Sequence, residues 1–335
     1  MSERKPPGGD SLYRGPSKAP RDKRERERDR RDQGEPAARA RPADRVAAAS
    51  PPRERSAGPG QPRERPPLRE RIGGERPPRD PAARDAVTPR PVQEQRIYGL
   101  NACLALFAKR PGALRKVWLL ESRIPALKAV LAYCVKQRLG YTIVEADDLE
   151  RLSGSAHNEG VVFGAMPAEE LSLSAWLDSL EPGPQLAVWL DGVGNPHNFG
   201  AILRSAAHFG ASGVLLSRES TLTLSGAAAR VAEGGAEALP LVRLGRSDNA
   251  IAQLQSAGFA VAATTVRGGQ SLYATKLPER LVLLMGAEQT GVDAALAQAA
   301  TIRLLIPGSG AVESLNVASA TSVLLSEWSR QRQLA

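Results

Sequence analysis

The fold of this chain can be worked out from the stretch DGVGNPHNFGAILRSAAHFGASG, which runs from Asp191 to Gly213. It follows the apolar run Leu186 to Leu190 and changes from a Gly/Asn/Pro turn to a helical pattern of small and apolar residues. A strand, a glycine-bearing turn and a helix N-terminus in this order open the backbone to an anionic or polar group. Within the motif NFGAILR, Asn198 places an amide at the helix start and Arg204 places a guanidinium two turns later. We therefore expect a binding site at this turn.

Strand-like and helix-like patterns alternate after this stretch. The predicted strands are GVLLS, LPLVRL, AVAATTV, RLVLLMGAE and TIRLLIP. Because LAVWLDGV is apolar almost throughout, we expect it to form a central parallel strand buried on both faces. The alternation predicts a mostly parallel, doubly wound α/β sheet over residues 185–335. A G-x-G-x-x-G fingerprint with an acidic residue about 20 positions later is absent, which disfavours a Rossmann-type nucleotide enzyme.

The N-terminal quarter has a different composition. Residues 1–90 carry 24 of the 45 Lys and Arg residues, 15 of the 36 Asp and Glu residues and 16 of the 26 prolines, so the whole net charge of +9 lies there. Since aromatic and β-branched residues are scarce, we predict a disordered basic arm over residues 1–95. The arm is either a solvated tail or a non-specific RNA tether whose arginines pair with phosphates. Its interleaved acidic residues weaken the second alternative, yet a basic arm on a neutral body still indicates a polyanionic partner.

Residues 96–168 form a second predicted α/β unit. Its strand-like runs are VWLLES (117–122), YTIVEA and GVVFGAM. Helical patterns separate them, and Gly140 is the C-cap signal of the longest helix. His157 and Asn158 are the polar pair that stands out, and a turn or a strand-edge cap is the favoured interpretation. Residues 169–184 are the predicted linker to the large domain.

Composition excludes several classes of protein. Two cysteines, Cys103 and Cys134, are too few for a Cys-rich zinc site or a disulfide framework, and we expect both in the core. We predict no metal site. No apolar run approaches the ~20 residues of a membrane span, and the N-terminus lacks the apolar core of a secretory signal. We therefore expect a cytoplasmic protein without a membrane partner.

Two later segments complete a set of three motifs: LLMGAEQTGV, from Leu283 to Val292, and IPGSGAVESLNVASA, from Ile306 to Ala320. Together with NFGAILR they resemble, in order and approximate spacing, the signature motifs of the SpoU/TrmH family (SPOUT superfamily) of RNA ribose 2′-O-methyltransferases. The resemblance covers about Ala187 to Trp328. It implies S-adenosylmethionine as the cofactor and rRNA or tRNA as the substrate.

The resemblance also implies features of the fold that periodicity does not reveal. The C-terminal part is expected to be a SPOUT α/β domain with a deep trefoil knot that holds S-adenosylmethionine. Residues 96–168 are expected to be an L30e-like RNA-binding domain, similar to ribosomal protein L30e. A homodimer through the catalytic domain is implied, with the last helix, Ser314 to Arg330, at the interface. The apolar positions of that helix fit either a core or an interface: Val317, Ala320, Leu324, Leu325 and Trp328.

By resemblance, Arg204 is the motif-one arginine that activates the ribose 2′-hydroxyl. Since a guanidinium stays protonated in proteins, pairing with the adjacent phosphate or with the developing alkoxide is the physically simpler role. Asn198 matches the asparagine that positions the arginine or the ribose, and Glu288 matches a carboxylate that orients Arg204. The alternatives are an exposed helical arginine, a helix N-cap for Asn198 and an N-cap acid for Glu288, before a helix that begins at Val292.

The other expected site residues belong to the later segments. Ser314 and Asn316 lie beside the substrate ribose by resemblance, and plain helix capping is their alternative role. The residues expected to hold S-adenosylmethionine are Thr264, Gly286, Gly291, Ile306 and Leu315.

Two stretches depart from the family pattern. HNEGVVFGA has Asn158 and Glu159 where the family has the single glutamine of its HQG strand, which bears on how the small domain contacts RNA. AEGGAE has Ala232 where many relatives carry a serine, which bears on the substrate or on catalytic competence.

We predict S-adenosylmethionine-dependent 2′-O-methylation of a ribose in rRNA or tRNA. The alternative is a non-catalytic RNA-binding or ribosome-assembly protein that retains the methyltransferase fold. The presence of every expected catalytic residue favours the enzyme.

Overall fold

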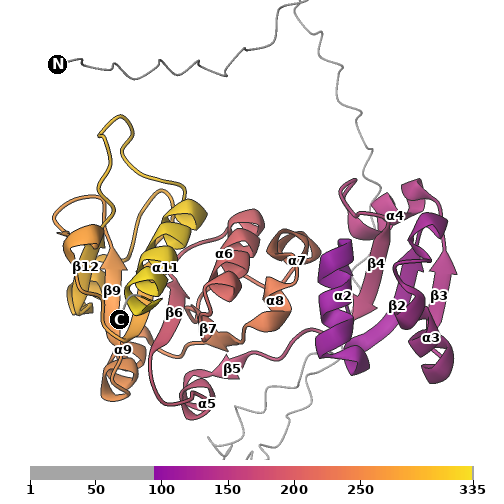
Figure 1. Ribbon diagram of the computed structural model, residues 1–335, viewed down its shortest axis with the longest axis horizontal. Helices are drawn as coiled ribbons and strands as arrows, with labels where there is room; N and C mark the ends of the chain where they lie inside the picture. The colour runs from indigo at the N-terminus through magenta and orange to yellow at the C-terminus, as the bar shows by residue number, and fades with distance from the viewer. Residues whose placement is uncertain (1–93, 334–335) are drawn as a thin grey trace, which may run out of the picture. The chain divides into compact units, whose positions relative to one another are not determined.

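The computed structural model describes residues 94–333, apart from the side chains of Ser247 and Asp248 (Figure 1). The predicted disordered arm, residues 1–95, lies outside the described residues except for Glu94 and Gln95. The described part contains a sheet of four strands and a sheet of eight. None of its helices combines the length and the hydropathy that crossing a bilayer needs.

The smaller sheet has the strand order β1-β4-β2-β3. β4 lies antiparallel to both of its neighbours, whereas β2 and β3 are parallel. Its strands are β1 (Gln95–Tyr98), β2 (Leu114–Leu119), β3 (Gly140–Ile143) and β4 (Val161–Ala165), and its helices are α2 (Leu100–Lys109), α3 (Lys128–Gln137) and α4 (Ala146–Ser153). The predicted α/β unit is therefore present, with one strand, β1, that the sequence pattern did not reveal.

The two faces of the smaller sheet are covered differently. Val117 and Phe163 are fully buried in the core that α2 and α3 complete. On the opposite face, Tyr98 and Val162 pack with Leu149 of α4. The alternation of side chains along each strand produces this separation.

Two local predictions in this unit were wrong. β2 begins at Leu114 rather than at Val117, because a short 3-10 turn over Pro111–Ala113 leads directly into it. The C-cap of α3 is Arg138, which adopts a left-handed φ of 57°. Gly140 begins β3 instead. A left-handed cap favours glycine but other residues adopt it at a cost, so the glycine signal pointed too far along the chain.

The larger sheet has the strand order β10-β12-β9-β11-β6-β7-β8-β5, and every neighbouring pair is parallel. The predicted mostly parallel α/β sheet is therefore confirmed. Its strands are β5 (Leu171–Ser172), β6 (Gln185–Leu190), β7 (Gly213–Leu216), β8 (Leu241–Arg243), β9 (Ala260–Thr264), β10 (Gln270–Ser271), β11 (Arg280–Met285) and β12 (Ile302–Leu305). β5, in the segment predicted as a linker, adds an edge strand beside β8.

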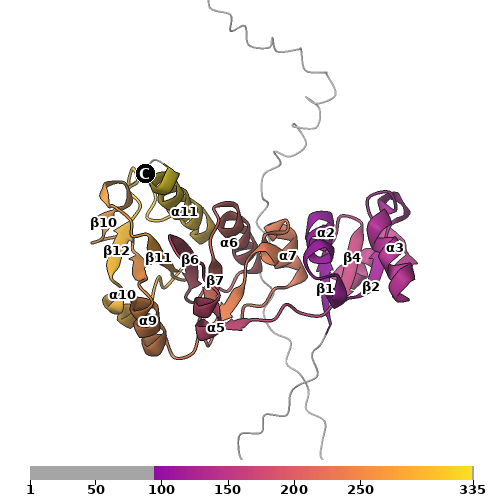
Figure 2. The same cartoon turned by 60° about the horizontal axis from the view of Figure 1, so that its bottom comes forward.

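Helices cover both faces of the larger sheet (Figure 2). They are α5 (Leu173–Asp178), α6 (Pro196–His208), α7 (Gly226–Ala232), α8 (Gly235–Ala238), α9 (Ser247–Ser256), α10 (Ala294–Ala299) and α11 (Val317–Gln333). The central strand β6 alternates between the two cores. Val188 and Leu190 join the core that includes α6 and α11, whereas Ala187 and Trp189 join the core that includes α5, α9 and α10.

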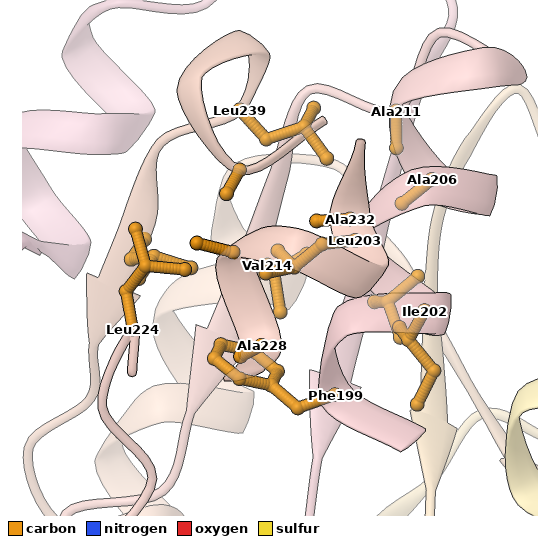
Figure 3. Packing of buried hydrophobic residues seen from close by; sticks show 14 of the residues in the cluster. Phe199, Ile202, Leu203, Ala206, Ala211, Val214, Leu224, Ala228, Ala232 and Leu239 are labelled. Carbon is orange, nitrogen blue, oxygen red and sulfur yellow. The ribbon is translucent and has the colours of Figure 1, made fainter. Parts of the chain in front are cut away.

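Small residues let α6 and α7 pack closely (Figure 3). A Cβ atom on Gly200 would lie 2.5 Å from the carbonyl oxygen of Ala228, so only glycine fits this crossing. Ala232, at the end of α7, is fully buried in the same cluster as Phe199 and Leu203. A serine at position 232 would bury a hydroxyl there, which gives the alanine a packing role.

α11 is a core helix of the large domain. Of the five apolar positions noted in its sequence, only Ala320 is partly buried. The other four are buried: Val317, Leu324, Leu325 and Trp328. The indole nitrogen of Trp328 donates a hydrogen bond to the carbonyl oxygen of Pro278, at 2.9 Å. The core interpretation of this apolar stripe is confirmed.

Candidate active site

The candidate site lies where β6 and β11 end, at one edge of the larger sheet. After β6 the chain turns at Gly192, which has a φ of +73°. α6 then begins at Pro196, and the side-chain oxygen of Asn195 accepts a hydrogen bond from the backbone N–H of His197, at 2.8 Å. Asn195 is thus the N-cap, and the N-cap alternative for Asn198 was wrong.

Three polar side chains from distant parts of the sequence converge at this edge. The amide nitrogen of Asn198 donates a hydrogen bond to Oε1 of Glu288. The amide nitrogen of Asn316 donates to the same carboxylate oxygen, at 3.0 Å, and to Oδ1 of Asn198, at 3.1 Å. We call these three residues the polar cluster. No described residue donates to Oε2 of Glu288, so the second carboxylate oxygen can receive a substrate group.

Asn316 and Glu288 of the polar cluster differ in their capping roles. Oδ1 of Asn316 accepts the backbone N–H of Ala318, at 2.9 Å, so Asn316 caps α11 and also belongs to the cluster. Glu288 caps no helix. The cap of α10 is Asp293, whose carboxylate accepts two backbone N–H groups. The helix expected to start at Val292 begins at Ala294, and the N-cap alternative for Glu288 was wrong.

Gly286 and Gly291 shape the loop that carries Glu288. Ala287 and Gly291 exchange two backbone hydrogen bonds, of 3.0 and 2.9 Å, which close a tight turn. A Cβ atom on Gly286 would lie 2.0 Å from the carbonyl carbon of Gly291. Gly286 is therefore required for the close approach of the chain to itself, and this approach presents Glu288 beside α6.

A cleft of about 250 Å³ opens beside the polar cluster. Its lining residues come from the loop after β6, the first turn of α6 and the loop after β11: Gly192, Val193, Gly194, Asn195, Asn198, Ala287, Glu288, Gln289 and Thr290. Asp191 was missed by the sequence analysis and joins these two loops, because its Oδ2 accepts the backbone N–H of Asp293, at 3.0 Å. An acidic residue directly after a buried strand is the signal that could have found it.

Arg204 lies outside the polar cluster. It follows Asn198 by six residues on α6, which places it about 9 Å further along the helix axis and about 120° around it. Its side chain is exposed and forms no ion pair or hydrogen bond with any residue in 94–333. At Arg204 the backbone of α6 packs closely against α8, because a Cβ atom on Gly235 of α8 would lie 3.0 Å from the Cα of Arg204. The expected contact of Glu288 with Arg204 is not formed, because Glu288 contacts the two amides instead.

The remaining predicted residues surround the same edge of the sheet. Thr264 ends β9, and its hydroxyl donates to the carbonyl oxygen of Leu284, at 3.1 Å. Ile306 directly follows β12 and is partly buried. Ser314 is exposed, and Leu315 exposes 48% of its surface although it is apolar.

The residues that depart from the family pattern have structural roles in the small unit. Asn158 is 6% exposed, and its Oδ1 accepts the backbone N–H of Gly160, at 2.9 Å, which confirms the turn interpretation. The carboxylate of Glu159 accepts the backbone N–H of Leu100 at the start of α2, at 3.0 Å, and lies 3.6 Å from the guanidinium of Arg230. Glu159 therefore caps a helix and pairs with a residue of α7.

Comparison with known proteins identifies the family. Residues 185–326 match the SpoU rRNA Methylase family, and residues 96–171 match the family described as RNA 2′-O ribose methyltransferase substrate binding. The chain is 37% identical to YfiF of Escherichia coli, an uncharacterised tRNA/rRNA methyltransferase, over 72% of this chain and 70% of that protein. This chain belongs to the SpoU rRNA methylase family. The polar cluster of this SpoU protein brings together one residue from each of its three motifs.

Two further relatives extend the comparison of this SpoU chain. It is 35% identical to the 23S rRNA (guanosine-2′-O-)-methyltransferase RlmB of Pseudomonas putida, over 72% of this chain and 98% of that protein. It also resembles the crystal structure of an AdoMet-bound rRNA methyltransferase from Sinorhizobium meliloti, with a TM-score of 0.59 and 28% identity over 72% of this chain and 88% of that one. The SPOUT-type fold expected from the sequence is therefore shown.

Proposed function

We propose that this chain methylates a ribose 2′-oxygen in rRNA or tRNA, with S-adenosylmethionine as the methyl donor. The observation that carries the proposal is the polar cluster of Asn198, Glu288 and Asn316, which joins the three motifs at one edge of the sheet. The RlmB relative that acts on guanosine 2′-oxygens of 23S rRNA and the AdoMet-bound relative support it.

The residues predicted to hold S-adenosylmethionine fit such a molecule. Thr264, Gly286 and Ile306 lie at the carboxyl ends of β9, β11 and β12, which are neighbours in the sheet. An edge of this kind is where open α/β sheets bind ligands. The exposed apolar side chain of Leu315 is suited to cover an adenine ring, and Gly291 keeps the loop after β11 tight. When bound, S-adenosylmethionine supplies an electrophilic methyl group on its sulfonium.

The polar cluster orients the ribose. Because two amides hold Oε1 of Glu288, its Oε2 is left to accept a hydrogen bond from the substrate. By resemblance, Ser314 contributes beside the ribose. Arg204 pairs with the phosphate next to that ribose and stabilises the negative charge that develops as the hydroxyl loses its proton. A guanidinium does not accept protons, so an oxygen of the substrate phosphate takes the proton. The ~9 Å between Asn198 and Arg204 along α6 suits the span of a nucleotide.

We further infer a homodimer through the large domain, a trefoil knot in its C-terminal part and a cytoplasmic location, all on the strength of the family resemblance. Most apolar residues of α11 are buried in the core of their own chain. Its partly buried residues, such as Ala320 and Val323, are the apolar positions that remain for a second copy.

The test is methyl transfer from labelled S-adenosylmethionine to rRNA and tRNA that lack the modification, followed by mapping of the labelled nucleotide. Arg204→Ala should lower the rate by about 100- to 1,000-fold, the usual effect of removing one group that stabilises developing charge. The matched control is Arg280→Ala, which removes an arginine at the amino end of β11, the opposite edge of the sheet. Binding of S-adenosylmethionine without transfer to any of these RNAs would support the non-catalytic RNA-binding alternative.

A further inference from the structure

One tryptophan of the chain has a setting unlike the other three. Trp176, Trp189 and Trp328 are buried, whereas Trp118, on β2 of the smaller sheet, is only partly buried. Its side chain lies on the sheet face opposite to Val117, the face that α2 and α3 do not cover. On this face Trp118 borders the cluster in which Leu149 of α4 packs, and the part of its ring beyond that cluster is exposed.

Two residues on this part of the sheet are glycines, which add no side chain of their own. Gly164 of β4 pairs with Lys116 of β2, and Lys116 pairs in turn with Gly140 of β3. A Cβ atom on Gly164 would lie 3.3 Å from the ring of Trp118, so the ring rests directly on the strand. The stem of Lys116 runs past the Cβ position of Gly140 at 3.9 Å. The Trp118 ring and the aliphatic part of Lys116 therefore lie close against the backbone of the sheet.

Two cations lie over the tryptophan ring. Nζ of Lys116 lies 4.9 Å from the ring centroid and Cζ of Arg96 lies 5.9 Å from it. Arg96 also donates a hydrogen bond to the carbonyl oxygen of Leu152, at 2.7 Å. Neither cation forms an ion pair with a carboxylate in residues 94–333. One carboxylate does lie at this face, because Oε2 of Glu94 is 3.5 Å from the Cβ position of Gly164.

We propose that this face, defined by Arg96, Lys116, Trp118 and Gly164, binds a single-stranded segment of the RNA substrate. One base stacks on Trp118 in place of the two cations, which move from the ring to the phosphates on either side of that base. An aromatic platform beside unneutralised cations is the arrangement by which proteins hold single-stranded nucleic acid. With two cations against the single carboxylate of Glu94, the face carries a net positive charge that complements RNA. Residues 1–90, which precede β1 in the chain, carry the whole excess positive charge of +9. The proposal rests on the proposed function, because it deepens the assignment of RNA as the substrate.

Tryptophan fluorescence of the full chain tests the stacking contact. Titration with a single-stranded uridine oligonucleotide should quench the emission, and Trp118→Phe should remove that quenching because the other three tryptophans are buried. Unchanged emission on binding, or quenching that persists in Trp118→Phe, would overturn the proposal. A ring already shielded from acrylamide before RNA is added would overturn it as well, because another part of the chain would then occupy the face.

Binding of the same oligonucleotide at several salt concentrations tests the two cations. Arg96→Gln with Lys116→Gln should lower the salt slope by about 1.4, at about 0.7 for each phosphate contact on a single strand. The matched control is Lys128→Gln with Lys136→Gln, two exposed lysines of α3 on the opposite face, and it should leave the slope unchanged. Equal slopes for the two double variants would refute the phosphate contacts.

The size of the stacking contribution follows from a third comparison. Trp118→Ala should weaken binding by about 5- to 150-fold, and Trp118→Phe should restore most of it because it keeps a stacking ring. If Trp118→Ala does not fold, the Phe variant and the cation variant still decide the question. These measurements need neither methyl donor nor turnover, so loss of the proposed methyl transfer and loss of this contact surface would be seen separately.

Discussion

Replacing Glu288 with glutamine tests the polar cluster most directly. The substitution keeps the size of the side chain and an oxygen acceptor for Asn198 and Asn316, but it removes the charge that both amides hold. A hydrogen bond to a charged group contributes ~1.5–3 kcal/mol and a neutral one ~0.5–1.5 kcal/mol. For two such bonds the expected loss is about 2 kcal/mol, or about 30-fold in rate.

The assay is single-turnover transfer of a labelled methyl group, with the affinity for S-adenosylmethionine measured separately. The rate should fall about 30-fold in Glu288→Gln, and the cofactor affinity should change by less than about threefold, which corresponds to about 0.7 kcal/mol. Glu279→Gln is the matched control. It makes the same substitution at an exposed carboxylate just before β11, at the opposite end of that strand.

Two results would contradict this reasoning. A Glu288→Gln rate equal to that of the control would show that the charged cluster does not set the geometry for transfer. A fall in cofactor affinity with an unchanged rate would make Glu288 a residue of the cofactor site instead.

Three further predictions concern the stability of the fold. Gly286→Ala should lower the free energy of unfolding by about 3 kcal/mol, because its Cβ would lie 2.0 Å from the backbone of the returning loop. Arg110 and Glu237 form two charged hydrogen bonds, of 2.7 and 2.8 Å, and their side chains are only 22% and 8% exposed, so a double-mutant cycle in urea should show a coupling of about 2–3 kcal/mol. A hydrogen bond from Arg330 lowers the pKa of Glu327 to about 2. The stability from this carboxylate is present above its ordinary pKa of 4.5 and is lost as the pH falls toward 2, so Glu327→Gln should reduce the acid dependence of the urea midpoint in that range.

Two of these predictions have a matched control in the same chain, and the third is a comparison with wild type. Gly112→Ala adds a Cβ with nothing within 4 Å and should leave the stability nearly unchanged. The pair Arg151–Asp148, with side chains 78% and 52% exposed, should show a coupling of only about 0.3–0.5 kcal/mol. If the two ion pairs showed equal coupling energies, burial would not be the reason for the strong coupling of Arg110 with Glu237. Parallel acid profiles for wild type and Glu327→Gln would show that other carboxylates set the acid limit.

Local patterns predicted most of the large domain correctly. The strand LAVWL and the helix after Pro196 were found because side-chain alternation and turn chemistry are properties of short segments. The caps were harder to predict. The N-cap of α6 is Asn195 rather than Asn198, and the N-cap of α10 is Asp293 rather than Glu288. Several polar residues compete near each helix start, and the backbone dihedrals that select one of them depend on how the loop packs.

The sequence by itself determined the alternation of strands and helices, the three motifs and the family they indicate, because these depend on residue types at short spacing. Only the tertiary structure decided that Asn198, Glu288 and Asn316 meet, since they lie 90 and 28 residues apart along the chain. Parallel pairing of β6 with β11 brings the ends of two distant strands to one edge of the sheet, and Asn316 at the N-terminus of α11 reaches the same edge. It also decided that Arg204 stands apart from this cluster, because the direction of a side chain depends on which face of α6 the core occupies.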